Sequence, residues 1–285
     1  MHFYNRRFED CVGLSISYTL IFYFGAVSNP ILFWEDIQEE RAIRGAVIFI
    51  NCALVLIFGL LFKVSNTRGY LEAKEYRVGA RFCYDCRQSK AERAHHCSRC
   101  KKCVKKMDHH CPWIGSCVNA DNFGNFTKLL GTVFITSLVG LGLYSVKFHR
   151  LLRVMVGITS ASWQLAVVAA NIIALVSIAL IIIVLLVRQT RLMLSNLTYV
   201  EWLHVRKLDR LDMVCPKNPY DKGSRGNMYE VFGSPLDFIL CRMPPSQDSI
   251  KYSNYWPPIR LTKNDSIRSS TTALNNTTDS GWGGA

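Results

Sequence analysis

The amino-acid sequence predicts an α-helical polytopic membrane protein with four transmembrane helices and a small cysteine-rich domain between the second and the third. Three observations carry this prediction. The 285-residue chain is 49% hydrophobic and yet strongly basic, with 34 Lys and Arg against 21 Asp and Glu and a formal charge of +13. It contains four long apolar stretches without a charged residue. Seven of its 11 cysteines lie between Cys83 and Cys117.

The four apolar stretches are long enough to cross a bilayer. The hydrocarbon layer is about 30 Å thick, so a spanning helix needs roughly 20 apolar residues. We expect spans at residues 11–34, 45–62, 129–146 and 162–187. The first stretch follows two arginines, as the core of a cleaved signal peptide would, but it is longer than the roughly 7–15 apolar residues of such a core.

The distribution of basic residues predicts the orientation in the membrane. Residues 63–128 contain 14 Lys and Arg against six acidic residues, and the chain from Arg188 onward contains 13 against nine. Because cytoplasmic loops are enriched in Lys and Arg, we expect both termini and the cysteine-rich segment in the cytosol. The loop expected after the third span argues the other way, since it holds Lys147, Arg150 and Arg153 without an acidic residue.

The segments outside the spans are polar. We expect residues 1–10 to be a cytosolic N-terminus and residues 188–245 a cytosolic segment that folds against the membrane face. Residues 246–285 are rich in Ser, Thr, Asn and Gly, which predicts a disordered tail. No internal repeat is apparent. The four spans disfavour a nucleic-acid-binding module, so the expected partner of the basic surface is the lipid bilayer and no nucleic acid.

Cysteines and histidines between residues 83 and 117 have the spacing of zinc ligands. A gap of two residues between cysteines lets one tight turn present both sulfurs to a tetrahedral ion. A disulfide framework is the alternative, which a reducing cytosol disfavours. The segment holds seven cysteines and four histidines, and a closed structural zinc site takes four ligands. Two zinc ions therefore leave three of these groups spare, and spacing alone does not identify them.

The tetrapeptide Asp108–His109–His110–Cys111 has the composition of an activated nucleophile. The thiolate is the reactive form of cysteine, a neighbouring imidazole takes its proton, and a carboxylate orients that imidazole. The alternative is that all four residues are ligands or caps of a metal site, and the tetrapeptide alone does not decide between the two.

The segment from Arg81 to about Phe126 resembles the cysteine-rich domain of the DHHC family of protein S-acyltransferases (palmitoyltransferases). It contains DHHCPW at 108–113, Cys117–Val118 and the stretch from Asn122 to Phe126. Two segments further on are similar to the family's TTxE and C-terminal motifs, namely residues 198–201 and residues 218–233. Three residues depart from the family's usual pattern in loops: Ala91, Ser116 and Asn119.

The resemblance implies a role for each group of residues. One structural Zn²⁺ ion would be held by Cys83, Cys86, His96 and Cys103, and a second by Cys97, Cys100, His110 and Cys117. Cys111 would then be the nucleophile, His109 its base and Asp108 the orienting carboxylate. The structural-motif residues would be Thr198 and Glu201 in the TTxE-like segment and Asn227 in the C-terminal motif, where Asn227 and the aromatic ring of Tyr220 would hold the tail against the core.

By the same resemblance the chain is expected to be a protein-cysteine S-palmitoyltransferase. It would move a long-chain acyl group from acyl-CoA (palmitoyl-CoA) through an S-acyl-Cys111 intermediate to membrane-proximal cysteines of cytosolic or membrane proteins. The expected location is the endomembrane system (Golgi or ER) or the plasma membrane, and an accessory subunit is left open. Acylation of Cys215 or Cys241 in the chain itself is a further hypothesis.

Specific residues are expected to contact the acyl-CoA. Cations gain Coulomb energy near a polyphosphate, so the candidates for the CoA head are Arg81, Lys90, Arg93 and His95. Trp113 is expected to line the thioester site. The acyl tail is expected among the spans, with Thr136, Ser137 and Tyr144 limiting its length. For any single basic residue, attraction to anionic lipid is the alternative.

Two other functions use a similar cluster. A catalytically silent zinc-bearing membrane adaptor would bind client proteins, and the intact tetrapeptide at 108–111 argues against it. A membrane-anchored RING-type ubiquitin ligase also uses two interleaved zinc ions. It needs a closing Cys-x2-Cys pair, and nothing after Cys103 supplies one. An acylation assay separates the enzyme from both.

Overall fold

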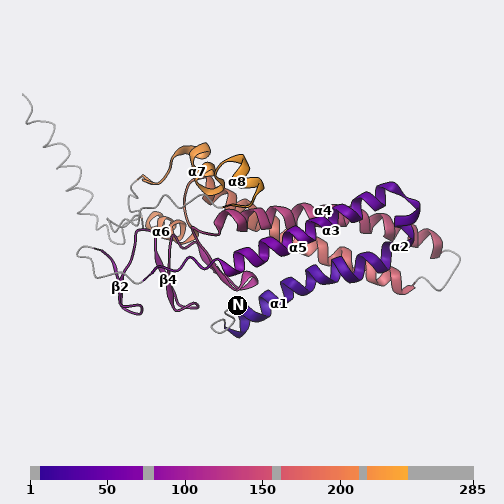
Figure 1. The fold of residues 1–285 in the computed structure, drawn as a ribbon, viewed down its shortest axis with the longest axis horizontal. Coiled ribbons are helices and arrows are strands. Elements are labelled where there is room, and N and C mark those ends of the chain that lie inside the picture. The colour runs from indigo at the N-terminus through magenta and orange to yellow at the C-terminus, as the bar shows by residue number, and fades with distance from the viewer. Residues whose placement is uncertain (1–6, 73–79, 156–161, 212–216, 243–285) are drawn as a thin grey trace, which may run out of the picture.

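The computed structural model describes residues 7–72, 80–155, 162–211 and 217–242. Figure 1 shows a bundle of long helices with the cysteine-rich domain and the short C-terminal helices gathered at one end of it. The N-terminal end of the first helix lies at this same end. The predicted tail at 246–285 and Cys215 lie outside the described residues.

Within the described residues, four helical segments are long and apolar enough to cross a membrane, which confirms the predicted fold class. The first runs through α1 (Phe8–Phe22), the π-helical stretch η1 (Tyr23–Ser28) and α2 (Asn29–Glu39). The other three are α3 (Arg41–Asn66), α4 (Phe123–Met155) and α5 (Ser162–Leu194). Each helix extends beyond the apolar stretch that predicts it.

The outward faces of the bundle are apolar. Leu180, Ile181 and Val184 on α5 are between 62% and 68% exposed. A helix that is hydrophobic all round is either enclosed by protein or surrounded by lipid, and α5 is not enclosed. Within a bilayer a helix also satisfies its own backbone hydrogen bonds. The exposed aliphatic side chains of α5 therefore suit contact with lipid chains.

The basic residues after the third apolar stretch belong to α4 and not to a loop. Lys147 pairs with Asp36 at 2.5 Å, and Arg150 pairs with Asp36 at 3.1 Å and with Glu40 at 2.7 Å. The helix continues because nothing between residues 146 and 155 breaks it, and the acids at the end of the first span neutralise its charges. The positive charge that the sequence places at this end of the bundle is therefore largely neutralised by ion pairs with Asp36 and Glu40.

The cysteine-rich domain consists of three two-stranded antiparallel hairpins. Their strands are β1 (Phe82–Cys83) with β2 (Gln88–Ser89), β3 (His95–Cys97) with β4 (Lys102–Val104), and β5 (His109–Cys111) with β6 (Ser116–Val118). The hairpins reveal an internal repeat of 14 residues, visible at Cys83, Cys97 and Cys111. The expectation of no repeat is therefore wrong. Only the first cysteine of each unit is kept throughout, which hides the pattern.

The third hairpin packs directly against the bundle. Its turn is the 3-10 segment η2 (Pro112–Ile114), and Ile114 and Val118 pack in one buried cluster with Leu60 and Val64 of α3. The C-terminal segment adds α6 (Tyr199–Arg210), α7 (Gly223–Phe232) and α8 (Pro235–Ile239). These contacts fix the residues at 108–114 against the ends of the membrane helices.

Candidate functional site

Two groups of thiols and imidazoles lie within the cysteine-rich domain. The ligand atoms in each group are all within 4.8 Å of one another: the first group is Cys83, Cys86, His96 and Cys103, and the second is Cys97, Cys100, His110 and Cys117. These are the two sets that the family resemblance implies. In each set, two cysteines come from the turn region of one hairpin, and a histidine and a cysteine face each other across the next.

The separations within the groups fit a tetrahedral ion. Ligands bound to zinc at about 2.0–2.3 Å lie roughly 3.5 Å apart or slightly more. His110 Nδ1 lies 3.4 Å from the Sγ of Cys100 and 3.6 Å from that of Cys117, and these two sulfurs are 3.6 Å apart. In the first group His96 Nδ1 is 3.2 Å from Cys86 Sγ. All described cysteines are free thiols. The donor set therefore suits Zn²⁺.

We expect purified protein to contain about two zinc ions per chain, because each closed structural site takes four ligands. Removal of the metal with a chelator is expected to unfold the hairpins, since strands of two or three residues are not stable alone. Elemental analysis together with a thermal melt measures both effects. A folded protein with one ion or none would contradict the assignment of two sites.

The repeat explains which cysteine is spare. The two cysteines of the first hairpin form a group with a histidine and a cysteine on the strands of the second hairpin. The two cysteines of the second hairpin form a group with a histidine and a cysteine on the strands of the third. Cys111 occupies in the third hairpin the place that Cys97 has in the second. No fourth hairpin follows, because α4 begins at Phe123. Of the seven cysteines between 83 and 117, Cys111 is the one outside both groups.

Cys111 lies beside a histidine and a buried carboxylate. His109 Nδ1 is 2.6 Å from Asp108 Oδ2, which leaves Nε2 for the Cys111 thiol. Burial opposes the charge on the His109 ring, but hydrogen bonds with Asp108 and Cys111 outweigh it and raise the pKa to about 9. The ring also packs edge-on against Phe126. His109 is thus a stronger base than a free imidazole and is fixed next to the thiol.

Asp108 is held by Gln189, which the sequence did not point out, and by Tyr199 in the motif at residues 198–201. It is 1% exposed, and its Oδ2 accepts a hydrogen bond from Gln189 Nε2 at 3.0 Å while its Oδ1 accepts from the backbone N–H of Tyr199 at 2.7 Å. Gln189 lies on α5 and is itself buried. Tyr199 begins α6, where Thr198 and Glu201 form a reciprocal capping box. The carboxylate is therefore fixed from two further elements.

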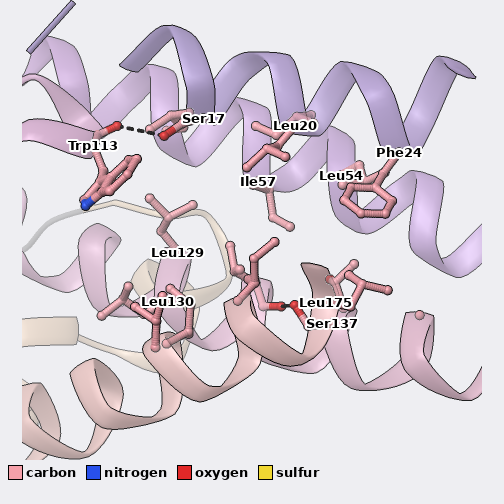
Figure 2. A pocket seen from close by; sticks show the side chains of 18 of the residues that line it. Ser17, Leu20, Phe24, Leu54, Ile57, Trp113, Leu129, Leu130, Ser137 and Leu175 are labelled. Carbon is pink, nitrogen blue, oxygen red and sulfur yellow. Dashed lines mark hydrogen bonds between the residues drawn. The ribbon is translucent and has the colours of Figure 1, made fainter. Parts of the chain in front are cut away.

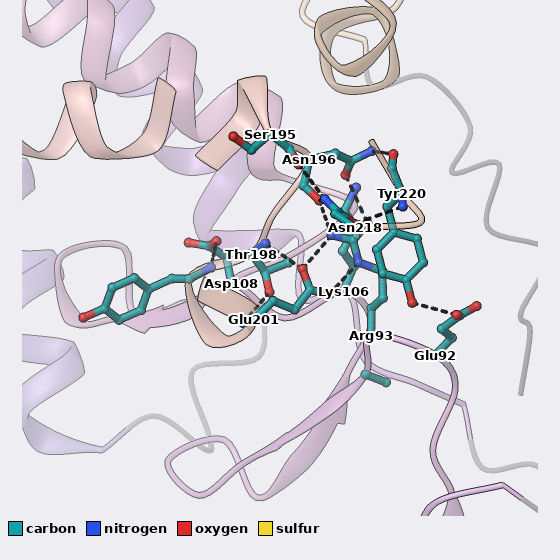
Figure 3. Close-up of polar contacts among 12 residues, drawn as sticks. Glu92, Arg93, Lys106, Asp108, Ser195, Asn196, Thr198, Glu201, Asn218 and Tyr220 are labelled. Carbon is teal, nitrogen blue, oxygen red and sulfur yellow. Dashed lines mark hydrogen bonds and ion pairs between the residues drawn. The ribbon is translucent and has the colours of Figure 1, made fainter. Parts of the chain in front are cut away.

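Arg93 does not lie at the surface, where a CoA contact would need it. Its side chain is 4% exposed, and its guanidinium binds both oxygens of the buried Glu201 at 2.7 Å and also Asn196. The ring of Tyr220 lies 4.1 Å from its guanidinium carbon (Figure 3). A desolvated bidentate pair of this kind fixes the position of a helix and turns the guanidinium toward protein partners. Arg93 thus ties the second hairpin to α6.

The other expected CoA contacts divide into two kinds. Burial, and then the positive charge of Arg81, lower the pKa of His95 to about 3, so its ring is neutral and offers no charge to a phosphate. Arg81 and Lys90 are half-buried neighbours at the base of the first hairpin, joined by a 2.6 Å backbone hydrogen bond. Trp113 is 55% exposed. Arg81, Lys90 and Trp113 remain accessible to a ligand.

A hydrophobic cavity of about 350 Å³ extends from Cys111 into the bundle. Cys111, Trp113 and Ile114 line one end of it, and Thr136, Ser137 and Tyr144 lie further along α4. Figure 2 shows Trp113 at one end and Phe24 and Leu175 toward the other. On α4 the lining runs from Phe126 to Tyr144, which is roughly 27 Å at 1.5 Å per residue.

The far end of the cavity is closed by a buried hydrogen-bond network. The Tyr144 hydroxyl lies 2.7 Å from Ser28 Oγ and donates to Asn29 Oδ1 at 2.9 Å. Asn171 Nδ2 donates to Ser28 Oγ at 2.8 Å. Because these residues come from three different spans, the network joins the helices and bounds the cavity at Tyr144 and Asn29.

The C-terminal motif residue Asn227 has a structural position. Its side-chain amide donates to the Leu194 carbonyl at the end of α5 and to Asp221, each at 2.7 Å, and it is 1% exposed. The hydrogen bonds tie α7 to the end of the fourth span. Asn227 therefore lies away from the thiol and contributes to the frame around it.

The described residues thus combine four helices that can cross a membrane, two interleaved Cys/His groups and one spare cysteine next to a histidine–aspartate pair. A sequence model of the DHHC palmitoyltransferase domain matches residues 77–206. The chain is 31% identical over 157 residues to probable protein S-acyltransferase 13 of Arabidopsis thaliana, which covers 55% of this chain and 49% of that relative. It is 27% identical over 267 residues to probable protein S-acyltransferase 16 of Arabidopsis thaliana. This match covers 81% of this chain and 89% of that relative.

Residues 77–206 of the chain match the DHHC palmitoyltransferase domain, and both relatives are probable protein S-acyltransferases. The matched stretch spans about half the length of the first of these relatives and most of the second. The family recognised in the tetrapeptide and its flanking motifs is thereby confirmed.

Proposed function

We propose that this protein is a protein S-palmitoyltransferase that transfers a long-chain acyl group from acyl-CoA to cysteines of other proteins through an S-acyl-Cys111 intermediate. One observation carries the proposal: Cys111 is the single cluster thiol outside the metal groups, and it lies both beside the His109–Asp108 pair and at the end of an apolar cavity. The nucleophile, the base and the acyl site thus meet at one sulfur.

In the first step His109 takes the proton of the Cys111 thiol, and the thiolate attacks the carbonyl carbon of the acyl-CoA thioester. The bond between that carbon and the CoA sulfur breaks, and His109 returns the proton to the departing CoA thiolate. Asp108 keeps Nδ1 of His109 occupied throughout, so that Nε2 serves the reaction. Cys111 ends the step as an S-acyl thioester.

In the second step a cysteine of a protein substrate occupies the place of CoA. His109 takes its proton, the new thiolate attacks the acyl carbonyl, and the Cys111 sulfur leaves and recovers a proton from His109. The two steps exchange one thioester for another, so no oxidant and no energy source is required. The structural zinc ions, once bound, stabilise the fold of the hairpins that present Cys111.

The cavity supports a long-chain acyl substrate. Its walls are aliphatic and aromatic, and burying acyl methylene groups gains about 0.8 kcal/mol for each. The CoA head would stay outside the cavity, and Arg81 and Lys90 at the base of the first hairpin are the proposed contacts for its phosphates. The hydrogen-bonded network at Tyr144 gives the cavity a defined end, which suits a limit on chain length.

The proposed orientation places the cysteine-rich domain in the cytosol, where acyl-CoA and reduced thiols occur. The large basic excess of residues 63–128 supports it. The opposing basic residues on α4 are paired with Asp36 and Glu40 and weigh less than their number indicates. Protein substrates with cysteines close to the membrane surface would reach Cys111, and an endomembrane location is consistent with this arrangement.

Bulk at Thr136 is expected to shorten the preferred acyl chain. Thr136 is 7% exposed and lines the cavity, so Thr136→Phe fills the space that the distal methylenes need. Loading rates across a series of acyl-CoA lengths should move toward shorter chains. Ile135→Phe is the matched control, because Ile135 is 54% exposed and does not line the cavity. An identical chain-length profile for Thr136→Phe and wild type would contradict this location of the acyl tail.

The proposal is tested by a two-step assay with purified protein. Labelled palmitoyl-CoA is added first, the excess is removed, and a lipid-anchored peptide with one cysteine is then supplied. We expect label on the protein in the first step and its movement to the peptide in the second. A folded, zinc-loaded protein that takes up no label would favour the adaptor function instead.

A further inference from the structure

The second metal group has a neighbour from a distant part of the chain. His110 turns Nδ1 toward the sulfurs of its group, and its Nε2 lies 3.1 Å from Asp10 Oδ1. Asp10 belongs to the first turn of α1, and its side chain is 3% exposed. A ligand histidine commonly donates its second ring N–H to a carboxylate, which fixes the orientation of the ring and makes it a better ligand.

Asp10 also contacts the other half of the same group. Arg99, which stands between the turn cysteines Cys97 and Cys100, donates from Nη2 to Asp10 Oδ1 at 2.8 Å. The carboxylate thus joins the turn of the second hairpin to His110 on the third. The charge of Arg99 offsets the cost of burying Asp10, and the N-terminal turn of a helix favours an acidic side chain.

The same face of α1 carries the turn that follows Cys111. Asp10, Gly13 and Ser17 are spaced by three and four residues and therefore line up on one side of the helix. A Cβ atom on Gly13 would lie 2.8 Å from the Pro112 carbonyl oxygen, so only glycine permits this approach. Ser17 Oγ donates to the Trp113 carbonyl at 3.1 Å (Figure 2).

We propose that the first membrane helix completes the second metal centre, with Asp10 as the positioning residue that orients the zinc ligand His110 and, through it, the adjoining Cys111. Each of the first two hairpins has its turn held by the next hairpin. The third has no successor, and the Asp10–Gly13–Ser17 face of α1 takes that place. The consequence for Cys111 rests on the proposed acyl transfer, whereas the effect on the metal does not.

The test compares the zinc affinity of matched variants of the full-length protein. Zinc retained per chain is measured across a series of chelator concentrations. Asp10→Asn is expected to lose one of its two ions at about 10–100-fold lower chelator, the usual effect of removing such a partner. Asp10→Glu should recover part of the loss. Asp85→Asn is the control, because Asp85 faces the first-site ligand His96 at 3.5 Å but is 76% exposed.

A folded Asp10→Asn variant with the chelator profile of wild type would overturn the proposal. Should that variant not fold, wild-type protein labelled with ¹⁵N-histidine decides. The Nε2–H of His110 is expected to exchange with water more slowly than that of His96, whose signal is assigned by its shift in Asp85→Asn. Equal exchange at the two rings would also overturn it.

These outcomes are independent of the proposed function. Chelator profiles and proton exchange need no acyl-CoA, so they can support the role of Asp10 in a protein that transfers nothing. Conversely, normal palmitoyl loading of wild type together with an unaltered Asp10→Asn zinc profile would retain the enzyme and reject the role of Asp10.

Discussion

Cys111→Ser is expected to abolish acyl loading while both zinc ions and near-wild-type thermal stability are kept. Cys111 lies outside both metal groups, so its replacement by a residue of similar size removes no ligand. The serine hydroxyl is far less acidic than the thiol, so no nucleophile forms at neutral pH. Loading with labelled palmitoyl-CoA, zinc content and a thermal melt are measured on the same preparation.

His109→Ala is the companion variant for this first prediction. It should keep the metal and slow loading by roughly 10²–10⁴-fold, as the loss of a general base does. Loss of a zinc ion from Cys111→Ser, with loading retained, would show that Cys111 is a zinc ligand and would contradict the proposed enzyme mechanism.

Cys97→Ser is expected to give the opposite pattern, because the metal and the fold should fail first. Cys97 holds the same place in the second hairpin as Cys111 in the third, but its sulfur belongs to the group with Cys100, His110 and Cys117. Removing one of four ligands opens the site and forfeits much of the binding energy that folds the domain. Zinc content and melting temperature should therefore fall together, with activity lost as a consequence.

The pair of variants forms one comparison of two equivalent positions in the repeat. A Cys97→Ser protein that keeps two zinc ions and wild-type stability would show that the second group is assembled differently. The comparison does not depend on the rate of acyl transfer, because zinc and stability are read directly.

The presence of two metal sites could be predicted from the spacing of cysteines and histidines, because the contacts within each pair are local, whereas the two ligand sets followed from the family resemblance. A pair such as Cys97 and Cys100 spans one turn, and a pair such as His110 and Cys117 faces across one short hairpin, so spacing encodes proximity. The four spans could also be predicted from sequence, since an uncharged apolar stretch of the required length has few other structural roles. Both features depend on residues that are close together in the chain.

The partners that fix the segment around Cys111 are distant in the chain and could not be predicted. Arg93 was expected to bind CoA because it is one cation in a basic loop, and its partner Glu201 lies 108 residues away. His110 meets Asp10 across 100 residues and Asp108 meets Gln189 across 81. Composition does not distinguish such buried pairs from surface charges. The 14-residue repeat was visible in principle, but its second position changes from Cys86 and Cys100 to Ile114.

The identity of the residue that carries the acyl group is the most direct test of the account. Wild-type protein is loaded with palmitoyl-CoA, digested without reducing agent, and analysed by mass spectrometry before and after neutral hydroxylamine. We expect one palmitoyl thioester on the peptide that contains Cys111, and we expect hydroxylamine to release it. A palmitoyl group found only on another cysteine of the cluster, with Cys111 unmodified, would contradict it.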